Sequence, residues 1–152
     1  MFVPCPRSWI FAALLGLFAV PVAAQQSENV TTIEGASGEK MTLTAQPFSV
    51  ADGLSVRAMG IEAEDTTTRW VLSLIGAAPE DDISLTYGDE SLRILEVNRP
   101  DDGVGPTKVY VSQEDFLTMA EIGTVTLTVG DVSTRLPEQL RREMRLIFNK
   151  VT

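Results

Sequence analysis

The chain has 152 residues, with 12 Lys and Arg against 21 Asp and Glu, no His, one Cys and a formal net charge of −9. The lack of histidine excludes a Ser-His-Asp triad, a Cys-His nucleophilic pair and imidazole metal ligands. The excess of acids argues against nucleic acid or an anionic lipid surface as the main partner, because both are recognised by clustered cations. The remaining residue types predict no cofactor and no metal site.

Residues 1–24 have the pattern of a bacterial secretory signal peptide. Arg7 precedes an apolar run from Trp9 to Val20, and small residues lead to a cleavage position after Ala24. The run is shorter than the about 20 apolar residues that span a bilayer, although an uncleaved anchor is the alternative interpretation. Cleavage would remove Cys5, the one thiol, so the exported domain would have no disulfide. We expect a periplasmic or extracellular location and no transmembrane span after cleavage.

The sequence after residue 24 predicts one domain preceded by a polar segment. Residues 25–40 are rich in Gly, Ser and Thr and lack periodicity, which is typical of a flexible leader. Residues 41–152 form a chain long enough to close a single hydrophobic core, and we expect one globular domain there.

Short β-like runs separated by turn residues fill most of this domain, and about six to eight strands are predicted. The candidate strands are Met41–Thr44, Ser55–Ile61, Trp70–Ile75, Ile83–Tyr87, Leu92–Val97, Lys108–Val111, Val125–Val129 and Val132–Leu136.

Two tight hairpins are predicted within this set. Gly88-Asp89 reverses Ile83–Tyr87 into Leu92–Val97, and Gly130-Asp131 reverses Val125–Val129 into Val132–Leu136. The segments SLTYGDESLRI (84–94) and TLTVGDVSTRL (126–136) agree at six of eleven positions. This agreement indicates either an internal duplication or two uses of the same turn.

Helical signals are confined to the C-terminal part. Ser112 followed by Asp115 is a capping arrangement for a short helix, and Pro137 fits the first position of a longer one. The longer helix has an apolar stripe of Leu140, Met144, Ile147, Phe148 and Val151. The predicted fold class is therefore α+β, with a small antiparallel sheet, a short helix and a C-terminal amphipathic helix packed on the sheet.

The polar side of the C-terminal helix is the candidate partner-contact face. It carries Arg141, Arg142 and Arg145, and residues 132–152 hold five basic and two acidic residues. One interpretation is a docking face for an anionic partner such as an acidic protein. The alternative is a solvated helix face whose cations complement the helix dipole and pair with acids such as Glu138.

Only three lysines follow the signal segment: Lys40, Lys108 and Lys150. An acidic, lysine-poor composition has two explanations. A saline habitat favours it because salt screens the self-repulsion of the acids. A genome rich in Arg codons would produce it without any physical purpose.

Enzymatic chemistry would have to rest on carboxylates. Paired acids serve as general acid and base in glycoside hydrolysis. Two dense acidic groups invite this interpretation, namely Glu62, Glu64 and Asp65, and Glu80, Asp81 and Asp82. Both lie beside turns, where acids normally face solvent, so no catalytic residue is assigned. Asp101-Asp102-Gly103 has the oxygen ligands that calcium prefers but lacks the spacing of an EF-hand loop.

These observations favour an exported, non-enzymatic domain that binds a protein or another component of the bacterial envelope. A second hypothesis is an acidic inhibitor of a basic secreted enzyme such as lysozyme, because charge complementarity would steer that association. A third is a carboxylate-based polysaccharide hydrolase.

Overall fold

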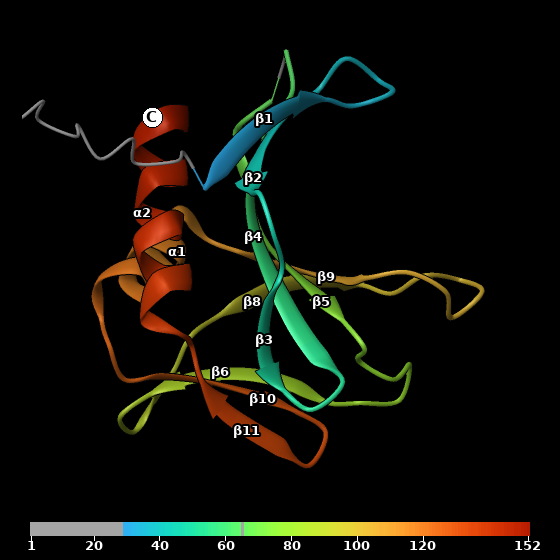
Figure 1. Cartoon of the computed structure of the whole chain (residues 1–152), viewed down its shortest axis with the longest axis vertical. Helices are drawn as coiled ribbons and strands as arrows, with labels where there is room; N and C mark the ends of the chain where they lie inside the picture. Colours follow the sequence, from blue (N-terminus) through green and yellow to red (C-terminus); the bar gives the residue numbers. More distant parts are fainter. Residues whose placement is uncertain (1–28, 65) are drawn as a thin grey trace, which may run out of the picture.

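The computed structural model describes residues 29–64 and 66–152 and shows an α+β fold of two antiparallel sheets and two helices (Figure 1). This confirms the predicted fold class. The larger sheet has the order β1-β2-β4-β5-β9-β8, and β3 pairs with the first half of β4. Its strands are β1 (Val30–Glu34), β2 (Lys40–Thr44), β3 (Phe48–Ala51), β4 (Leu54–Glu62), β5 (Arg69–Ile75), β8 (Ile94–Asn98) and β9 (Thr107–Val111).

The smaller sheet has the order β11-β10-β6-β7. Its strands are β6 (Ile83–Tyr87), β7 (Glu90–Ser91), β10 (Val125–Val129) and β11 (Val132–Arg135). The two helices, α1 (Gln113–Glu121) and α2 (Glu138–Val151), pack against each other, α1 against β5 and α2 against β2 and β4. The Oγ of Ser112 accepts the N–H of Asp115 at 3.0 Å, as the capping pattern predicted. Pro137 is the N-cap of α2, one position before its predicted place.

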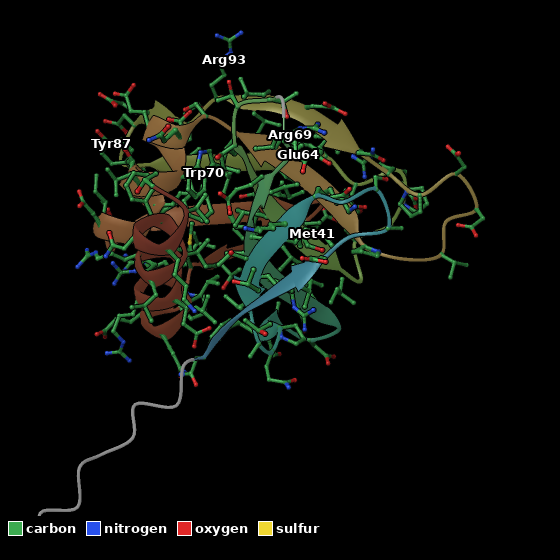
Figure 2. All side chains as sticks on the ribbon, turned by 90° about the horizontal axis from the view of Figure 1, so that it is seen from above. Met41, Glu64, Arg69, Trp70, Tyr87 and Arg93 are labelled. Carbon is green, nitrogen blue, oxygen red and sulfur yellow. The ribbon has the colours of Figure 1, made fainter. Side chains whose placement is uncertain are left out.

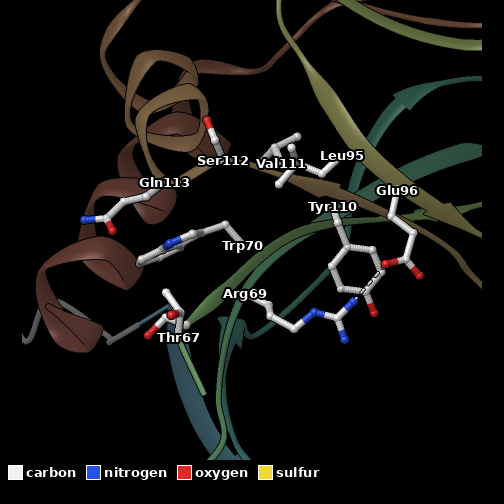
Figure 3. A pocket seen from close by; sticks show the side chains of 10 residues that line it. Thr67, Arg69, Trp70, Leu95, Glu96, Tyr110, Val111, Ser112 and Gln113 are labelled. Carbon is white, nitrogen blue, oxygen red and sulfur yellow. Dashed lines mark hydrogen bonds and ion pairs between the residues drawn. The ribbon is translucent and has the colours of Figure 1, made fainter.

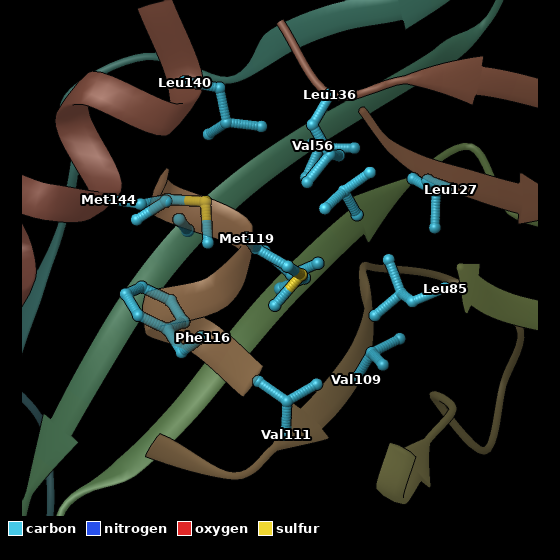
Figure 4. Close-up of a cluster of buried hydrophobic side chains, with 14 of the residues drawn as sticks. Val56, Leu85, Val109, Val111, Phe116, Met119, Leu127, Leu136, Leu140 and Met144 are labelled. Carbon is cyan, nitrogen blue, oxygen red and sulfur yellow. The ribbon is translucent and has the colours of Figure 1, made fainter. Parts of the chain in front are cut away.

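One main core fills the space between the sheets and the helices (Figure 4). Alternate residues of β4, β5, β9 and β10 point into it, because successive side chains of a strand face opposite sides of the sheet. Its buried members include Val56, Leu72, Leu74 and Val109 from the larger sheet, Leu85 and Leu127 from the smaller sheet, and Phe116, Met119, Leu140, Met144 and Ile147 from the helices.

The central strand β5 is buried on both of its faces. Trp70, Leu72 and Leu74 enter the main core, whereas Val71 belongs to a second cluster on the other side of the larger sheet. The second cluster consists of Leu43, Met59, Val71 and Tyr110. Burial on both faces explains the continuous apolar run WVLSLI in the sequence.

The predicted flexible leader at 25–40 is wrong from Val30 onward. Val30–Glu34 is the edge strand β1, which pairs antiparallel with β2 and buries Val30 in the main core. The other four residues of β1 are exposed. A strand with one buried side chain has no apolar alternation, so its sequence resembles a leader. β3 was missed for the same reason, since its four residues alternate little in burial.

The first predicted hairpin is only partly right. Gly88 and Gly130 adopt positive φ values of 55° and 56°, and both tight reversals form. However, the strand that returns from Gly88-Asp89 is only β7, and the chain then crosses to the larger sheet, where β8 pairs with β9. The predicted strand Leu92–Val97 therefore corresponds to β8, which begins two residues later and pairs with β9 instead of with β6.

The two similar segments of the sequence lie side by side in the smaller sheet. β6 and β10 pair antiparallel with Leu85 opposite Leu127, and these two leucines are also equivalent when the segments are aligned. The two hairpins are consequently related by an approximate twofold axis through this pair. Both leucines point into the main core.

Candidate binding site

The three arginines of the predicted contact face make different contacts. The guanidinium of Arg145 donates to the backbone carbonyl of Ala120 at 3.5 Å, and the side chain of Arg141 lies against Gly123. Arg142 turns away and forms an exposed ion pair with Glu138, with 3.0 Å between Nη1 and Oε1. The ion pair is the one that the solvated-face alternative anticipated.

Arg141 and Arg145 instead contact the neighbouring helix, α1. Both side chains approach the C-terminal end of α1, where the final carbonyls carry partial negative charge. The last turn of α1 has no basic residue of its own. These two arginines therefore stabilise the junction of the helices, and Arg142 is the freest of the three for an outside partner.

A pocket of about 290 Å³ lies at one end of the larger sheet (Figure 3). It forms where β5 begins, β9 ends and α1 starts, with β8 as the outer wall. The lining residues are Thr67, Thr68, Arg69, Trp70, Leu95, Glu96, Tyr110, Val111, Ser112 and Gln113.

The polar side of this pocket is formed by Arg69, Tyr110 and Glu96, and the two charges in this group neutralise each other. The guanidinium of Arg69 lies 3.9 Å from the ring centroid of Tyr110, a cation–π contact, and its Nη2 is 3.2 Å from Oε2 of Glu96. Figure 3 shows the three side chains together at one side of the pocket. Because the charge of Arg69 is already matched by Glu96, this group does not present a free cation.

The apolar side of the pocket is Trp70, which is 2% exposed. Its ring stacks on Phe148 with centroids 5.3 Å apart and lies tilted against Phe116 at 4.7 Å. The indole Nε1 is buried and has no hydrogen-bond partner. In Figure 3 the edge of the indole ring that carries Nε1 faces the start of α1. Trp70 is therefore a packing residue of the main core on the central strand β5.

No protein-family model, curated protein or solved structure matches this chain.

The outer wall of the pocket, β8, is the exposed edge of the larger sheet. No strand pairs with its outer side within the described ranges, and four of its five residues are exposed. Leu95 is 53% exposed, and Val97 is also an exposed large apolar side chain. In Figure 2 this yellow-green strand runs along the margin of the molecule. An unpaired edge with apolar side chains is a ready site for pairing with another chain.

Two of the acids considered for catalysis or calcium binding hold turns in place. Asp81 closes a turn by accepting the N–H of Ala78 at 2.8 Å, and Asp102 accepts the N–H of Val104 at 2.9 Å. Asp65 lies outside the described residues. In the parts of the chain that the structure covers, no three metal-binding side chains come together. No helix there is long and apolar enough to cross a membrane.

Sequence reasoning missed the pocket because three separate segments build it. Residues 67–70, 95–96 and 110–113 meet only through the pairing of β5 with β9 and of β9 with β8. The one available signal was the apolar pair Leu95 and Val97, which alternates with polar residues and resembles a half-buried strand.

Proposed function

We propose that this protein is an exported domain that acts by binding another protein rather than by catalysis. Export rests on the signal-peptide pattern of residues 1–24. The absence of histidine from the whole sequence removes the commonest catalytic acid-base residue.

The observation that carries the proposal is the exposed edge strand β8. Soluble proteins normally protect sheet edges with Lys, Pro or a covering segment. β8 has a β-bulge at Leu95 and one charged side chain, Glu96, which is paired with Arg69, but it still places Leu95 and Val97 in solvent. An apolar edge of this kind is stable in solution when a partner covers it.

The test is capture of proteins from envelope and culture extracts on the immobilised full chain, with three versions in parallel. Leu95→Lys places a charge on β8, whereas Leu146→Lys changes an equally exposed leucine (50%) on α2. We expect one specific protein to be retained by the wild type and by Leu146→Lys. Retention of nothing by either version would contradict the binding function, whatever surface is used.

The net charge of −9 favours one other candidate, an inhibitor of a basic secreted enzyme. Association would then be steered by long-range attraction and would slow as salt is added. Lysozyme activity measured with the protein at low and high ionic strength separates the two. Inhibition at low salt that vanishes at high salt supports the inhibitor, and unchanged activity at both removes lysozyme as its target.

A further inference from the structure

The hairpin of β1 and β2 packs on α2 through a largely polar layer. Thr42 of β2 is opposite Gly60, and a Cβ at Gly60 would lie 3.5 Å from Ile147 of α2, so this side of β2 faces the helix. Thr44 faces the same way, because alternate residues of a strand share a side, and both threonines are buried. Figure 1 shows the start of β1 beside the same helix. β1 adds one apolar side chain, Val30, to the main core there.

A carboxyl group lies in this layer. Glu143 of α2 is 3% exposed and accepts a hydrogen bond from Nε2 of Gln139 at 3.3 Å. Its other hydrogen-bond partner is the side chain of Asn29, the residue directly before β1. Glu143 therefore connects α2 to the beginning of β1, and this connection is lost when β1 separates from the helix.

Few other contacts hold β1 in place. Its backbone pairs with β2 alone among the described strands, and four of its five residues are exposed. The hydroxyls of Thr32 and Thr42 form one cross-strand hydrogen bond of 3.1 Å. The hydroxyl of Thr44, opposite Val30 in the pairing, is buried and has no hydrogen-bond partner among the described residues. Separation of β1 would let water reach this hydroxyl and the Glu143 carboxyl, and hydration is favourable for both groups.

The charges around Glu143 oppose its burial only in part. Burial raises the pKa of Glu143, while hydrogen bonds from Gln139 and Asn29 and the charge of Arg142 lower it. Arg142 is the one charged group among these causes. The other charged residues on α2 and on the elements packed against it are Glu34 of β1, Lys40 of β2, Arg57 and Glu62 of β4, Glu114, Asp115 and Glu121 of α1, and Glu138, Arg141, Arg145 and Lys150 of α2 itself.

The position of Glu143 makes the attachment of β1 sensitive to its ionisation. A carboxylate is disfavoured in the closed layer relative to water, so ionisation favours the open form in which β1 has left α2. The effect falls between the ordinary pKa of an exposed carboxyl and the raised pKa of the buried one. Because one proton is linked to opening, the equilibrium constant for opening rises by at most about tenfold per pH unit.

We infer that β1 is a pH-dependent latch, which is closed on α2 while Glu143 is protonated and opens as this carboxyl ionises. The latch consists of Val30–Glu34 together with Asn29 and Glu143. Its action does not depend on what the protein binds.

Amide hydrogen exchange of the full chain from about pH 5 to about pH 8, corrected for the intrinsic effect of pH on exchange, tests the latch. We expect β1 to lose protection severalfold as the pH rises and to stay less protected than the central strand β5, which reports unfolding of the whole domain. In Glu143→Gln the protection of β1 should not change with pH. Glu138→Gln alters an exposed acid of the same helix and should behave like the wild type.

A protection of β1 that is constant with pH in the wild type would overturn the inference, and so would the same pH dependence in Glu143→Gln. Equal protection of β1 and β5 would also overturn it, because β1 would then leave only when the whole domain unfolds. Asn29→Ala gives a second test. Its lost hydrogen bond stabilises the ionised carboxyl, so β1 should lose protection mainly at high pH, and an equal loss across the pH range would contradict the latch.

Discussion

Glu143 is the only charged side chain among the buried residues that the structure describes, and it is 3% exposed. It lies on the side of α2 that faces the larger sheet, among Leu140, Met144 and Ile147. Burial raises the pKa of Glu143, while hydrogen bonds from Gln139 and Asn29 and the charge of Arg142 act in the opposite direction. The carboxyl is thus a buried group whose charged form is disfavoured.

The stability of the protein should therefore fall as the pH rises through the range in which Glu143 titrates. Between its unfolded and its raised folded pKa, the folded state keeps a proton that the unfolded state has lost, so deprotonation favours unfolding. Glu143→Gln should remove this part of the pH dependence. Urea unfolding from about pH 4 to pH 8 measures both effects. Glu138→Gln is the control, since Glu138 is exposed, and an equal effect of the two variants would contradict the argument.

Trp70 combines a large buried ring with an unsatisfied donor. Replacement by Ala should cost about 3–5 kcal/mol, because the stack with Phe116 and Phe148 is lost and a cavity forms. Trp70→Phe keeps an aromatic ring and also removes Nε1, whose burial without a partner costs about 1–3 kcal/mol. We expect Trp70→Phe to cost much less than Trp70→Ala in urea unfolding. A similar cost for both would contradict the argument that removing the unsatisfied Nε1 offsets part of the lost packing.

At the level of elements, α1 depends on its cap. Ser112 accepts the N–H of Asp115 and donates its own hydroxyl to the Asp115 carboxylate at 2.8 Å. Ser112→Ala should destabilise the protein by about 1 kcal/mol, and Ser112→Asn should recover most of this loss because its side chain also caps. Denaturant midpoints measure the series. No difference between Ala and Asn would contradict a capping role.

The two hairpins of the smaller sheet offer a matched comparison. Gly88 and Gly130 have nearly the same positive φ, but a Cβ at Gly88 would meet nothing within 4 Å, whereas one at Gly130 would lie 2.6 Å from the Asp81 carboxylate. Gly88→Ala should cost about 1–2 kcal/mol for the left-handed backbone alone. Gly130→Ala should cost more, because the turn that Asp81 closes must also move. Equal unfolding free energies for the two variants would show that the turn closed by Asp81 moves without a measurable cost in free energy.

Across the whole molecule, local patterns predicted the elements better than their arrangement. The alternation in β6 and β10, the glycine turns and the stripe on α2 are short-range signals, and the structure contains all of them. The position of β8 depends instead on its pairing with β9, across a loop that no periodicity describes. The pocket depends on the same long-range pairing of β8 with β9. The contacts of Arg141 and Arg145 with α1 are also long-range, because they form only after the two helices pack.

The net charge of the chain affects the stability of the whole folded state. Twenty-one acids face twelve bases, and the ion pairs Arg69–Glu96 and Arg142–Glu138 are both exposed. Exposed pairs contribute little, so repulsion among the acids is the larger electrostatic effect on the folded state.

Added NaCl should therefore stabilise this protein against urea, because screening weakens the repulsion that compaction imposes. The gain should be largest below about 0.5 M, where the screening length changes most. It should shrink in a variant with Glu62→Gln and Glu64→Gln, which reduces the net negative charge without changing either ion pair. A urea midpoint that falls as salt is added would show that attraction between the acids of the sheets and the bases of α2 outweighs the repulsion among the acids. A rising midpoint is the physical benefit that a saline habitat would select, whereas codon bias alone predicts the acidic composition without any such requirement.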